Sequence, residues 1–226
     1  MSGSALVTGV TGGLGGAVAR RLLADGWRVV APVRGDGHAP PPDVVAVPAD
    51  LSNEAEVAAA VEAAAADPDR PLRAVVNLVG GFATGGRVHE TPVEAFEEQL
   101  RLNLRTAYVV TAAALPHLIA AGGGSIVCVS SRAALRPFSG AAGYITAKAA
   151  LLAFVSALAV EYRDDHIRAN AIIPSVIDTP ANRANEPGAD YSRWVRPEQL
   201  AATISFLCGD ASAATSGAHI PVYGRA

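Results

Sequence analysis

The sequence predicts an α/β fold in which a doubly wound, parallel sheet of seven strands carries helices on both faces. Short apolar runs rich in β-branched residues alternate along the chain with longer stretches of helical periodicity, the pattern of repeated β-α-β units. Most of the short runs are apolar throughout, as expected for strands covered on both faces. A run rich in glycine at residues 9–15 then marks a tight turn from the first strand into the first helix.

Seven strands and five helical segments are expected. The strands are expected at Ser4–Thr8, Arg28–Val33, Val44–Val47, Ala74–Leu78, Ser125–Val129, Arg168–Ile173 and His219–Val222. The helices are expected at Leu14–Ala24, Glu54–Ala66, Val93–Ala121 (one helix or two), Tyr144–Tyr162 and Pro197–Cys208. Ser52 and Thr91-Pro92 precede two of these helices as capping residues. Irregular stretches are expected at residues 38–43 and 181–196.

The bulk composition favours a single domain, residues 1–226, in the cytoplasm. Half of the 226 residues are apolar, and there is no internal repeat, linker or composition break. The formal net charge of −3 gives no reason to expect nucleic acid or a membrane as a partner. The N-terminal apolar segment is too short for a signal peptide, and we expect no helix to reach membrane-spanning length.

The cysteines and histidines predict no metal site. Cys128 and Cys208 are far apart, in no metal-binding or redox spacing, and we expect them to be free, buried thiols. The five histidines also lack the spacing that is typical of metal ligands.

The glycine turn predicts a binding site for the pyrophosphate of a dinucleotide in a Rossmann-like fold. The first strand leads into Thr8-Gly9-Val10-Thr11-Gly12-Gly13-Leu14-Gly15, where a helix begins. Glycines let the backbone approach a pyrophosphate, and the helix N-terminus supplies free N–H groups and partial positive charge. Because the spacing differs from the common Gly-x-Gly-x-x-Gly fingerprint, a glycine-rich turn without a ligand is the alternative. The expected cofactor contacts here are Gly9, Thr11, Gly13, Leu14 and Gly15.

The residue after the second strand bears on the choice between NAD(H) and NADP(H). An acid about 20 residues after the glycines would bind the ribose hydroxyls of NAD. This chain has Val33 followed by Arg34, so no carboxylate repels a 2′-phosphate and the guanidinium is able to pair with it. We therefore expect NADP(H) to be preferred over NAD(H). The alternatives are a solvated Arg34, or an NAD ribose bound by Asp36.

Two further strand ends are expected to border the cofactor. Asp50-Leu51 follows the third strand and is placed to meet the adenine ring, although a cap for the next helix explains Asp50 equally well. Asn77-Leu78-Val79-Gly80 follows the fourth strand at the carboxyl edge, where doubly wound sheets bind ligands. Asn77 and Gly80 are therefore candidate cofactor contacts.

Tyr144 and Lys148 form the predicted catalytic pair. In Tyr144-Ile-Thr-Ala-Lys148 the two side chains are one helical turn apart and lie on the same face. An ammonium beside a phenol favours the phenolate, so we expect Lys148 to lower the pKa of Tyr144 from about 10. Such a tyrosine protonates a carbonyl oxygen as hydride arrives, or deprotonates an alcohol in the reverse direction. Alone, the pattern also fits an exposed tyrosine and lysine.

Two polar positions complete the pattern. Ser130-Ser131 follows the apolar run Ile126–Val129, which places a hydroxyl at the carboxyl edge of the sheet, although a serine pair after a strand is usually a cap. Asn103 lies in the helical segment Leu100–Leu104, where an aliphatic residue is expected, and alone would be a hydrogen-bonded core amide. Together with the glycine turn, these residues predict one catalytic constellation.

The chain resembles the short-chain dehydrogenase/reductase family over essentially its whole length. The matching pieces are Thr8-Gly9…Gly13-Leu14-Gly15, Asp50-Leu51, Asn77-Leu78-Val79-Gly80, Asn103, Ser131, Tyr144, Lys148, Asn170-Ala-Ile-Ile-Pro174 and Asp178-Thr179-Pro180. The resemblance implies an oxidoreductase that transfers a hydride between NAD(P)(H) and a carbonyl or alcohol. It also implies a homodimer or homotetramer packed through the helices that contain Asn103 and Tyr144.

The resemblance implies a role for each catalytic position. Tyr144 is the expected acid/base, and Lys148 lowers its pKa and hydrogen-bonds the nicotinamide ribose. Ser131 holds the substrate oxygen, in the manner of an oxyanion donor. Asn103 positions a water in a proton relay to Lys148. Thr179 contacts the nicotinamide carboxamide and orients the ring.

The chain departs from the family pattern in three places. Asn77 begins Asn-Leu-Val-Gly where Asn-Asn-Ala-Gly is usual, and Pro174-Ser175 replaces the usual Pro-Gly. Pro174 is still an expected cofactor contact. The family's substrate lid, which we place around residues 180–196, is short here. A short lid implies a less covered pocket, or a small or planar substrate.

The lid also resembles that of dihydropteridine reductases, through Asp178-Thr179-Pro180-Ala181-Asn182-Arg183 and Ala189-Asp190-Tyr191-Ser192-Arg193-Trp194. Those enzymes resemble NADH users and typically lack the catalytic serine, whereas this chain has Val33 and Ser131. A carbonyl reductase or alcohol dehydrogenase is therefore the main hypothesis, and a dihydropteridine- or quinone-type reductase is the second. The third, a non-catalytic dinucleotide sensor, would not need the four catalytic residues together.

Overall fold

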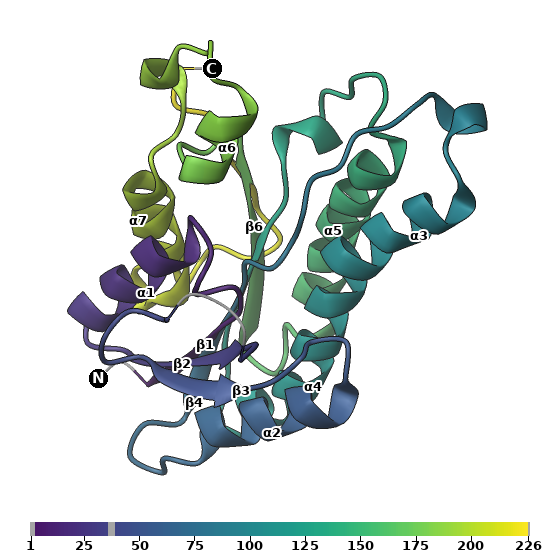
Figure 1. Ribbon diagram of the computed structural model, residues 1–226. Coiled ribbons are helices and arrows are strands. Elements are labelled where there is room, and N and C mark those ends of the chain that lie inside the picture. The colour runs from purple at the N-terminus through teal and green to yellow at the C-terminus, as the bar shows by residue number, and fades with distance from the viewer. Residues whose placement is uncertain (1–2, 36–38, 226) are drawn as a thin grey trace.

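The computed structural model describes residues 3–35 and 39–225 and confirms the doubly wound α/β fold (Figure 1). The strands are β1 (Ser4–Val7), β2 (Arg28–Val33), β3 (Val45–Pro48), β4 (Leu72–Asn77), β5 (Gly124–Val129), β6 (Ile167–Pro174) and β7 (His219–Val222). They form one sheet in the order β3-β2-β1-β4-β5-β6-β7, with every neighbouring pair parallel. The strand order therefore reverses between β1 and β4, where such sheets bind ligands.

Helices cover both faces of the sheet (Figure 1). On one face, α1 (Gly15–Ala24) packs beside α7 (Pro197–Cys208), and their apolar side chains share a cluster with β1, β2 and β4. On the other face, α2 (Glu54–Ala65), α4 (Thr106–Ala120) and α5 (Ala142–Glu161) enclose a second cluster. α3 (Val93–Leu100) packs along α5. Burial on both faces explains the continuously apolar strands.

The long segment predicted at Val93–Ala121 is not one regular helix. α3 is followed by a π-helical turn, Arg101–Arg105, and then by α4. Asn103 lies in the middle of this turn and is completely buried. A π-helical turn widens the helix by one residue and is often found at functional sites. The other predicted helices and strands are present, and each end lies within two residues of its predicted position.

Two helix starts are capped differently from the prediction. Asn53, not Ser52, caps α2, because its side-chain oxygen accepts a hydrogen bond from the Ala55 N–H. Pro92 occupies the N-cap of α3, and the Thr91 hydroxyl donates instead to the carbonyls of Gly86 and Arg87. The prediction for Thr91 is wrong because a 3-10 turn, Val88–Glu90, brings these carbonyls within its reach.

The segment after β6 is more regular than predicted. It contains a short helix, α6 (Pro180–Asn185), and a 3-10 turn, Tyr191–Arg193. Thr179 caps α6, since its Oγ1 accepts from the Asn182 N–H at 3.2 Å, and Pro180 occupies the first helical position. Asp36, the alternative ribose ligand, lies outside the described residues.

The expectation that no helix reaches membrane-spanning length is wrong. α5 has 20 residues and is apolar enough to cross a membrane by length and composition. It packs against β6 and α3, and its buried side chains include Leu151, Leu152 and Val155. Its composition is therefore also that of a helix in the core of a domain.

Candidate active site

The glycine turn lies where the strand order reverses, between the end of β1 and the start of α1. Gly9 has a φ of +69°, a conformation that favours glycine. A Cβ on Gly15 would collide with the Gly9 carbonyl oxygen, so only glycine fits there. Gly12 and Gly13 are exposed, and within the described residues no side chain caps the N-terminus of α1. The turn thus presents bare main chain to a ligand, which fits the pyrophosphate of a dinucleotide.

Thr179 contacts this turn from the far end of the sequence. A Cβ on Gly13 would lie 2.7 Å from Cγ2 of Thr179. Thr179 follows β6, whose last residue, Pro174, is buried beside β7. The structure therefore brings two predicted cofactor contacts together across the sheet edge.

Thr8 has a positioning role that the sequence analysis missed. Its Oγ1 accepts hydrogen bonds from the main-chain N–H groups of Leu78 at 3.0 Å and Val79 at 3.3 Å. These bonds fix the loop after β4 against the end of β1, beside the glycine turn. In the sequence, the hydroxyl of Thr8 directly after the apolar residues 5–7 was the signal that could have indicated this role.

The side chain of Asn77 does not face the glycine turn. Its Nδ2 donates to Thr111 Oγ1 at 3.1 Å and lies 3.7 Å from Cys128 Sγ, in the interior beneath α4. Its Oδ1 is buried and has no partner among the described residues. Asn77 therefore holds β4, β5 and α4 together, and we expect its contact with a cofactor to come from the main chain.

Gly80 lies where Asn103 and Lys148 meet. A Cβ on Gly80 would lie 2.7 Å from Asn103 Oδ1 and 3.0 Å from Lys148 Nζ. The Asn103 amide clamps the next residue, because its Oδ1 accepts from the Gly81 N–H at 3.1 Å and its Nδ2 donates to the Gly81 carbonyl at 3.0 Å. Two predicted catalytic residues are thus adjacent at the carboxyl end of β4.

Lys148 is buried, and the end of β5 holds it on two sides. Its Nζ donates to the Val129 carbonyl at 3.0 Å, and the Ser130 hydroxyl donates to the Lys148 carbonyl at 2.8 Å. Burial lowers the pKa of Lys148 to about 8, although the neighbouring Cys128 thiol acts in the opposite direction. Ser130 is a second positioning residue without a role in the sequence analysis.

Burial, not Lys148, dominates the acidity of Tyr144. Desolvation raises the pKa of Tyr144, and a side-chain hydrogen bond with Ser131 opposes that shift. Lys148 Nζ lies 5.8 Å from the centre of the Tyr144 ring and donates to Val129 instead. The prediction that Lys148 lowers the pKa of Tyr144 is therefore wrong in this structure, whereas the proximity of Tyr144 and Ser131 is confirmed.

The adenosine end of the predicted cofactor site is open to solvent. Thr11, Arg34 and Asp50 are exposed. Hydrogen bonds from Ser52, together with the positive charge of Arg34, lower the pKa of Asp50. Arg34 and Asp50 are thus close enough to interact. Leu51 packs against the cluster between α2 and α4.

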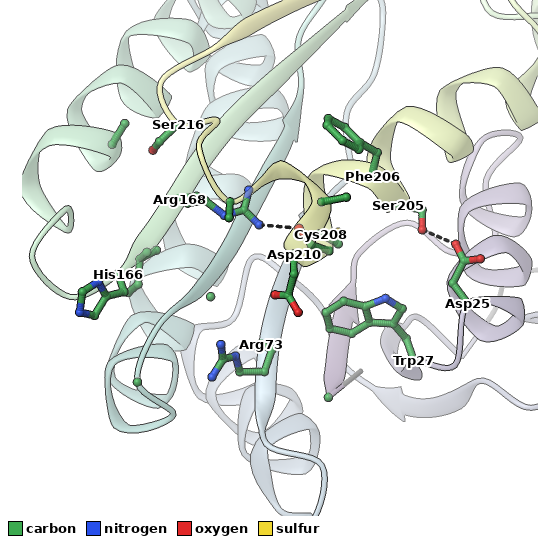
Figure 2. A pocket seen from close by; sticks show the side chains of 18 of the residues that line it. Asp25, Trp27, Arg73, His166, Arg168, Ser205, Phe206, Cys208, Asp210 and Ser216 are labelled. Carbon is green, nitrogen blue, oxygen red and sulfur yellow. Dashed lines mark hydrogen bonds between the residues drawn. The ribbon is translucent and has the colours of Figure 1, made fainter. Parts of the chain in front are cut away.

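A cavity of about 1350 Å³ lies at the amino edge of the sheet, opposite these residues (Figure 2). Two of the arginines that line it bind carbonyls at the C-terminal ends of helices. Arg73 donates to the Ala121 carbonyl at 2.8 Å, and Arg168 donates to the carbonyls of Leu207 and Gly209 at 3.0 and 3.1 Å. Cations at these helix ends offset the partial negative charge there. We therefore interpret these residues as structural and place the active site at the carboxyl edge.

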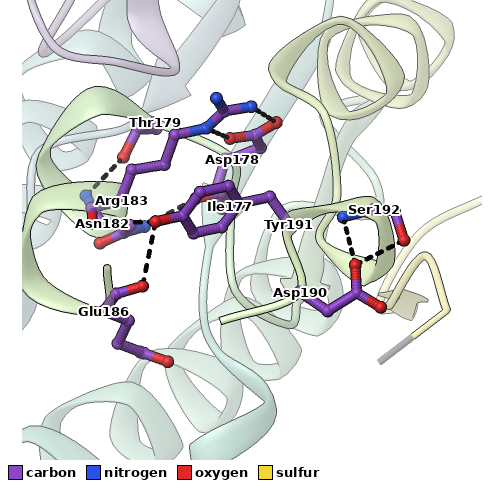
Figure 3. A network of polar contacts seen from close by, with 9 residues as sticks. All are labelled: Ile177, Asp178, Thr179, Asn182, Arg183, Glu186, Asp190, Tyr191 and Ser192. Atoms are coloured by element: carbon purple, nitrogen blue, oxygen red, sulfur yellow. Dashed lines mark hydrogen bonds and ion pairs between the residues drawn. The ribbon is translucent and has the colours of Figure 1, made fainter. Parts of the chain in front are cut away.

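A polar network joins residues of the segment after β6, which we predict to be the substrate lid (Figure 3). Arg183 pairs with Asp178 at 2.5 and 2.8 Å, and its guanidinium lies 4.7 Å above the Tyr191 ring. The Tyr191 hydroxyl reaches the carbonyls of Arg183 and Glu186. These contacts tie α6 to the 3-10 turn that follows it.

The chain is similar to known proteins over almost its full length. A family model described as enoyl-(acyl carrier protein) reductase matches residues 9–224. The 2-(R)-hydroxypropyl-CoM dehydrogenase of Xanthobacter autotrophicus is 34% identical, with 99% of this chain and 98% of that protein covered. Dehydrogenase/reductase SDR family member 4 of Bos taurus is 32% identical, with 97% and 85% covered. The structure of a short-chain type dehydrogenase/reductase from Mycobacterium ulcerans is 29% identical, with a TM-score of 0.89 and 100% and 90% covered.

Proposed function

The chain belongs to the short-chain dehydrogenase/reductase family and is an NAD(P)-dependent oxidoreductase, and from this premise we propose that it interconverts a carbonyl compound and its alcohol with Tyr144 as the acid/base. One observation carries the proposal. Asn103 and Lys148 meet at Gly80, Lys148 Nζ lies 5.8 Å from the centre of the Tyr144 ring, and Tyr144 hydrogen-bonds Ser131, all at the same sheet edge as the glycine turn. A relative that is 34% identical, named for a hydroxypropyl compound, supports an alcohol as one reactant.

Tyr144 and Ser131 are the groups proposed to meet the substrate oxygen. A bound reduced nicotinamide supplies a hydride to the carbonyl carbon. The carbon–oxygen π bond breaks, and the Tyr144 hydroxyl donates its proton to the oxygen, which yields an alcohol and a tyrosinate. Ser131 donates a hydrogen bond to the same oxygen. The raised pKa of Tyr144 keeps its hydroxyl protonated at neutral pH, as a general acid requires.

Lys148 and Asn103 are proposed to restore the Tyr144 proton. The pKa of Lys148, about 8, means that this side chain releases and regains a proton near neutral pH. Asn103 Oδ1 and Lys148 Nζ both lie beside Gly80, and we propose that a water bridges these two groups. In this proposal Asn103 orients that water, and Lys148 passes the proton to Tyr144.

Replacing Tyr144 by phenylalanine tests the proposal directly. Tyr144→Phe removes one hydroxyl and keeps the ring, so we expect kcat/KM for carbonyl reduction to fall by at least about 100-fold. Cofactor binding is measured by the fluorescence of reduced nicotinamide. The affinity is expected to stay within about twofold, a change of about 0.4 kcal/mol in binding free energy, because the variant loses only one hydroxyl and keeps the ring.

Tyr108→Phe is the matched control, since Tyr108 is 57% exposed on α4 and outside the site. Both variants are assayed on a panel of ketones, quinones and quinonoid dihydropterin. Full turnover by Tyr144→Phe would reject the role of Tyr144. Turnover of the dihydropterin alone would favour the pterin-reductase alternative that the lid sequence raised.

We also propose that NADP(H) is the preferred cofactor. Arg34 is exposed directly after β2, where an NAD-binding acid would be expected, and its charge reaches Asp50, which follows the neighbouring strand β3. We expect Arg34→Ala to lower kcat/KM with NADPH about tenfold, as the loss of one charged hydrogen bond does, and to leave NADH within about twofold. A wild-type enzyme that turns over faster with NADH would contradict this preference.

A further inference from the structure

Phe82 contacts the Tyr144 ring, and Phe138, from a different loop, contacts Phe82 in turn. Phe82 follows β4, and its ring lies 5.0 Å from the Tyr144 ring at an angle of 83°, an edge-to-face contact. Phe138 lies between β5 and α5, and its ring is 6.2 Å from that of Phe82. Both distances are in the range of favourable aromatic pairs. The Phe82–Phe138 pair thus adjoins the proposed proton donor.

The pair is open to solvent, although its members are large and apolar. Phe82 is 58% exposed and Phe138 is 47% exposed, and Leu135, on the same segment as Phe138, is 52% exposed. Neighbouring apolar side chains left in water are unfavourable, and a patch of this kind beside polar residues marks a ligand site. The patch therefore lies ready to cover an apolar group next to the reacting oxygen.

The main chain holds the two loops together. The Gly85 N–H donates to the Gly140 carbonyl at 2.8 Å, which joins the loop of Phe82 to the loop of Phe138. Gly140 has a φ of +83°, and a Cβ there would lie 2.8 Å from the Gly85 carbonyl oxygen, so this close approach depends on glycine. The pair is thus set in place before a ligand arrives, which reduces the entropy lost on binding.

The charged side chain next to Ser131 packs on a different aromatic ring from those of Phe82 and Phe138. Arg132, the first residue after Ser131, has its guanidinium 5.7 Å above the Tyr223 ring. Tyr144 thus has Phe82 against its ring and Ser131 as its hydrogen-bond partner, with Lys148 Nζ 5.8 Å from the ring centre. Aromatic rings attract another ring beyond what buried area alone gives, so this surface discriminates an aryl group from an alkyl group of equal size.

We propose that Phe82 and Phe138 are specificity-determining residues that select a carbonyl attached to an aromatic ring. The inference rests on the proposed function, because it places the carbonyl oxygen at Tyr144 and Ser131. In reduction, the aryl ketone carbon receives the hydride of NAD(P)H and its oxygen receives the Tyr144 proton. The products are a benzylic alcohol and NAD(P)+. The ring of the substrate packs against Phe82 and Phe138.

The test compares two ketones of matched size, acetophenone and cyclohexyl methyl ketone, in wild type, Phe82→Leu, Phe138→Leu and the double variant. Leucine keeps an apolar side chain and removes the ring. We expect kcat/KM for acetophenone to fall at least tenfold in the double variant, and that for cyclohexyl methyl ketone to fall less than threefold. Because the ratio of the two ketones is compared between variants, their intrinsic reactivities cancel.

Phe206→Leu is the control, since Phe206 is 47% exposed and lines the cavity at the opposite edge (Figure 2). Cofactor affinity and circular dichroism report whether each variant is folded. Equal losses for both ketones would mean that the pair only positions Tyr144, which overturns the inference and leaves the proposed function intact. Failure of the wild type with every carbonyl in the panel would overturn the proposed function as well.

Discussion

At the scale of single residues, burial determines the chemistry of the site more than direct contact between ionisable groups does. The hydroxyl of Tyr144 and the amine of Lys148 are both largely withdrawn from water. Burial raises the pKa of Tyr144 and lowers the pKa of Lys148, so in both cases it favours the neutral form. The Cys128 thiol, next to Lys148, follows the same rule, because burial raises its pKa to about 11. A bound cofactor would therefore meet a largely uncharged pocket at alkaline pH.

Replacing Lys148 by methionine is expected to remove a pH dependence of stability. The folded-state pKa, about 8, is below the ordinary value of 10.5, so between these values the unfolded chain binds more protons than the folded one. The unfolding free energy of the wild type therefore rises relative to Lys148→Met from pH 8 to 10.5, by on the order of 3 kcal/mol. Urea unfolding of both proteins at pH 7, 8, 9 and 10 measures the difference. Parallel pH curves for the two proteins would contradict a buried, titrating lysine.

The sequence predicted which residues the structure brings together at the candidate site, but not the environment of each one. The i, i+4 spacing of Tyr144 and Lys148 was sufficient to put them on one helix face, because helix geometry is local. The direction of the Tyr144 pKa shift and the inward turn of Asn77 depend on desolvation and on partners distant in sequence. No local pattern encodes these properties.

At the scale of elements, the strand-to-helix alternation was predictable, whereas the π-helical turn was not. The apolar runs could be predicted from local hydrophobic periodicity, and the glycine turn from the backbone freedom of glycine. The π-helical turn at Arg101–Arg105 depends on a contact across the fold, between Asn103 and Gly81. The prediction that Thr91 caps α3 was wrong for a related reason. The preceding 3-10 turn places the carbonyls of Gly86 and Arg87 within hydrogen-bonding distance of the Thr91 hydroxyl.

Gly15→Ala is expected to disrupt the turn at the start of α1. The added methyl would collide with the Gly9 carbonyl and with Val10, so the backbone must shift. We expect a loss of stability of about 1–3 kcal/mol, as for other overpacked sites, and at least a tenfold loss of cofactor affinity. Thermal unfolding and cofactor titration measure the two effects.

Gly16→Ala is the neighbouring control. A Cβ at Gly16 meets only the flexible end of Arg20 at 3.3 Å among its closest neighbours, with Pro41 and the Val10 carbonyl oxygen at 3.9 Å. Alanine also has the higher helix propensity, so this variant is expected to be as stable as the wild type or slightly more stable. Equal behaviour of the two variants would show that close packing at Gly15 does not govern the turn.

At the scale of the whole molecule, the parallel sheet separates two edges of different character. All strands end at the edge that holds the glycine turn, Ser131 and Gly80, and this location follows from the order of the elements. The cavity at the amino edge was not predictable, since it forms between strand starts and the capped ends of α4 and α7. Its volume alone would have pointed away from the edge that holds the candidate site.

A homodimer or homotetramer is the expected assembly. α4 and α5 expose apolar side chains on their outer surface, among them Tyr108, 57% exposed, and Val160, 65% exposed. Light scattering after gel filtration should give a multiple of the 23.0 kDa chain mass. We expect Tyr108→Asp to shift the protein toward the monomer, and Val88→Asp, at an exposed 3-10 turn, to leave the mass unchanged. A wild type that elutes as a monomer would contradict this expectation.

The two ends of the lid lie side by side, since Ile177 pairs with Val195, the Val195 N–H donates to Val176 and the Asp178 N–H donates to Val195. The residues between them form a loop whose two ends are held side by side by these contacts, and this arrangement does not depend on the length of the loop. Insertions, deletions or exchanges within that loop leave the distance from β6 to α7 unchanged. If residues 180–196 are the substrate lid that we predict, its exchange would alter substrate range without a change in the spacing of β6 and α7.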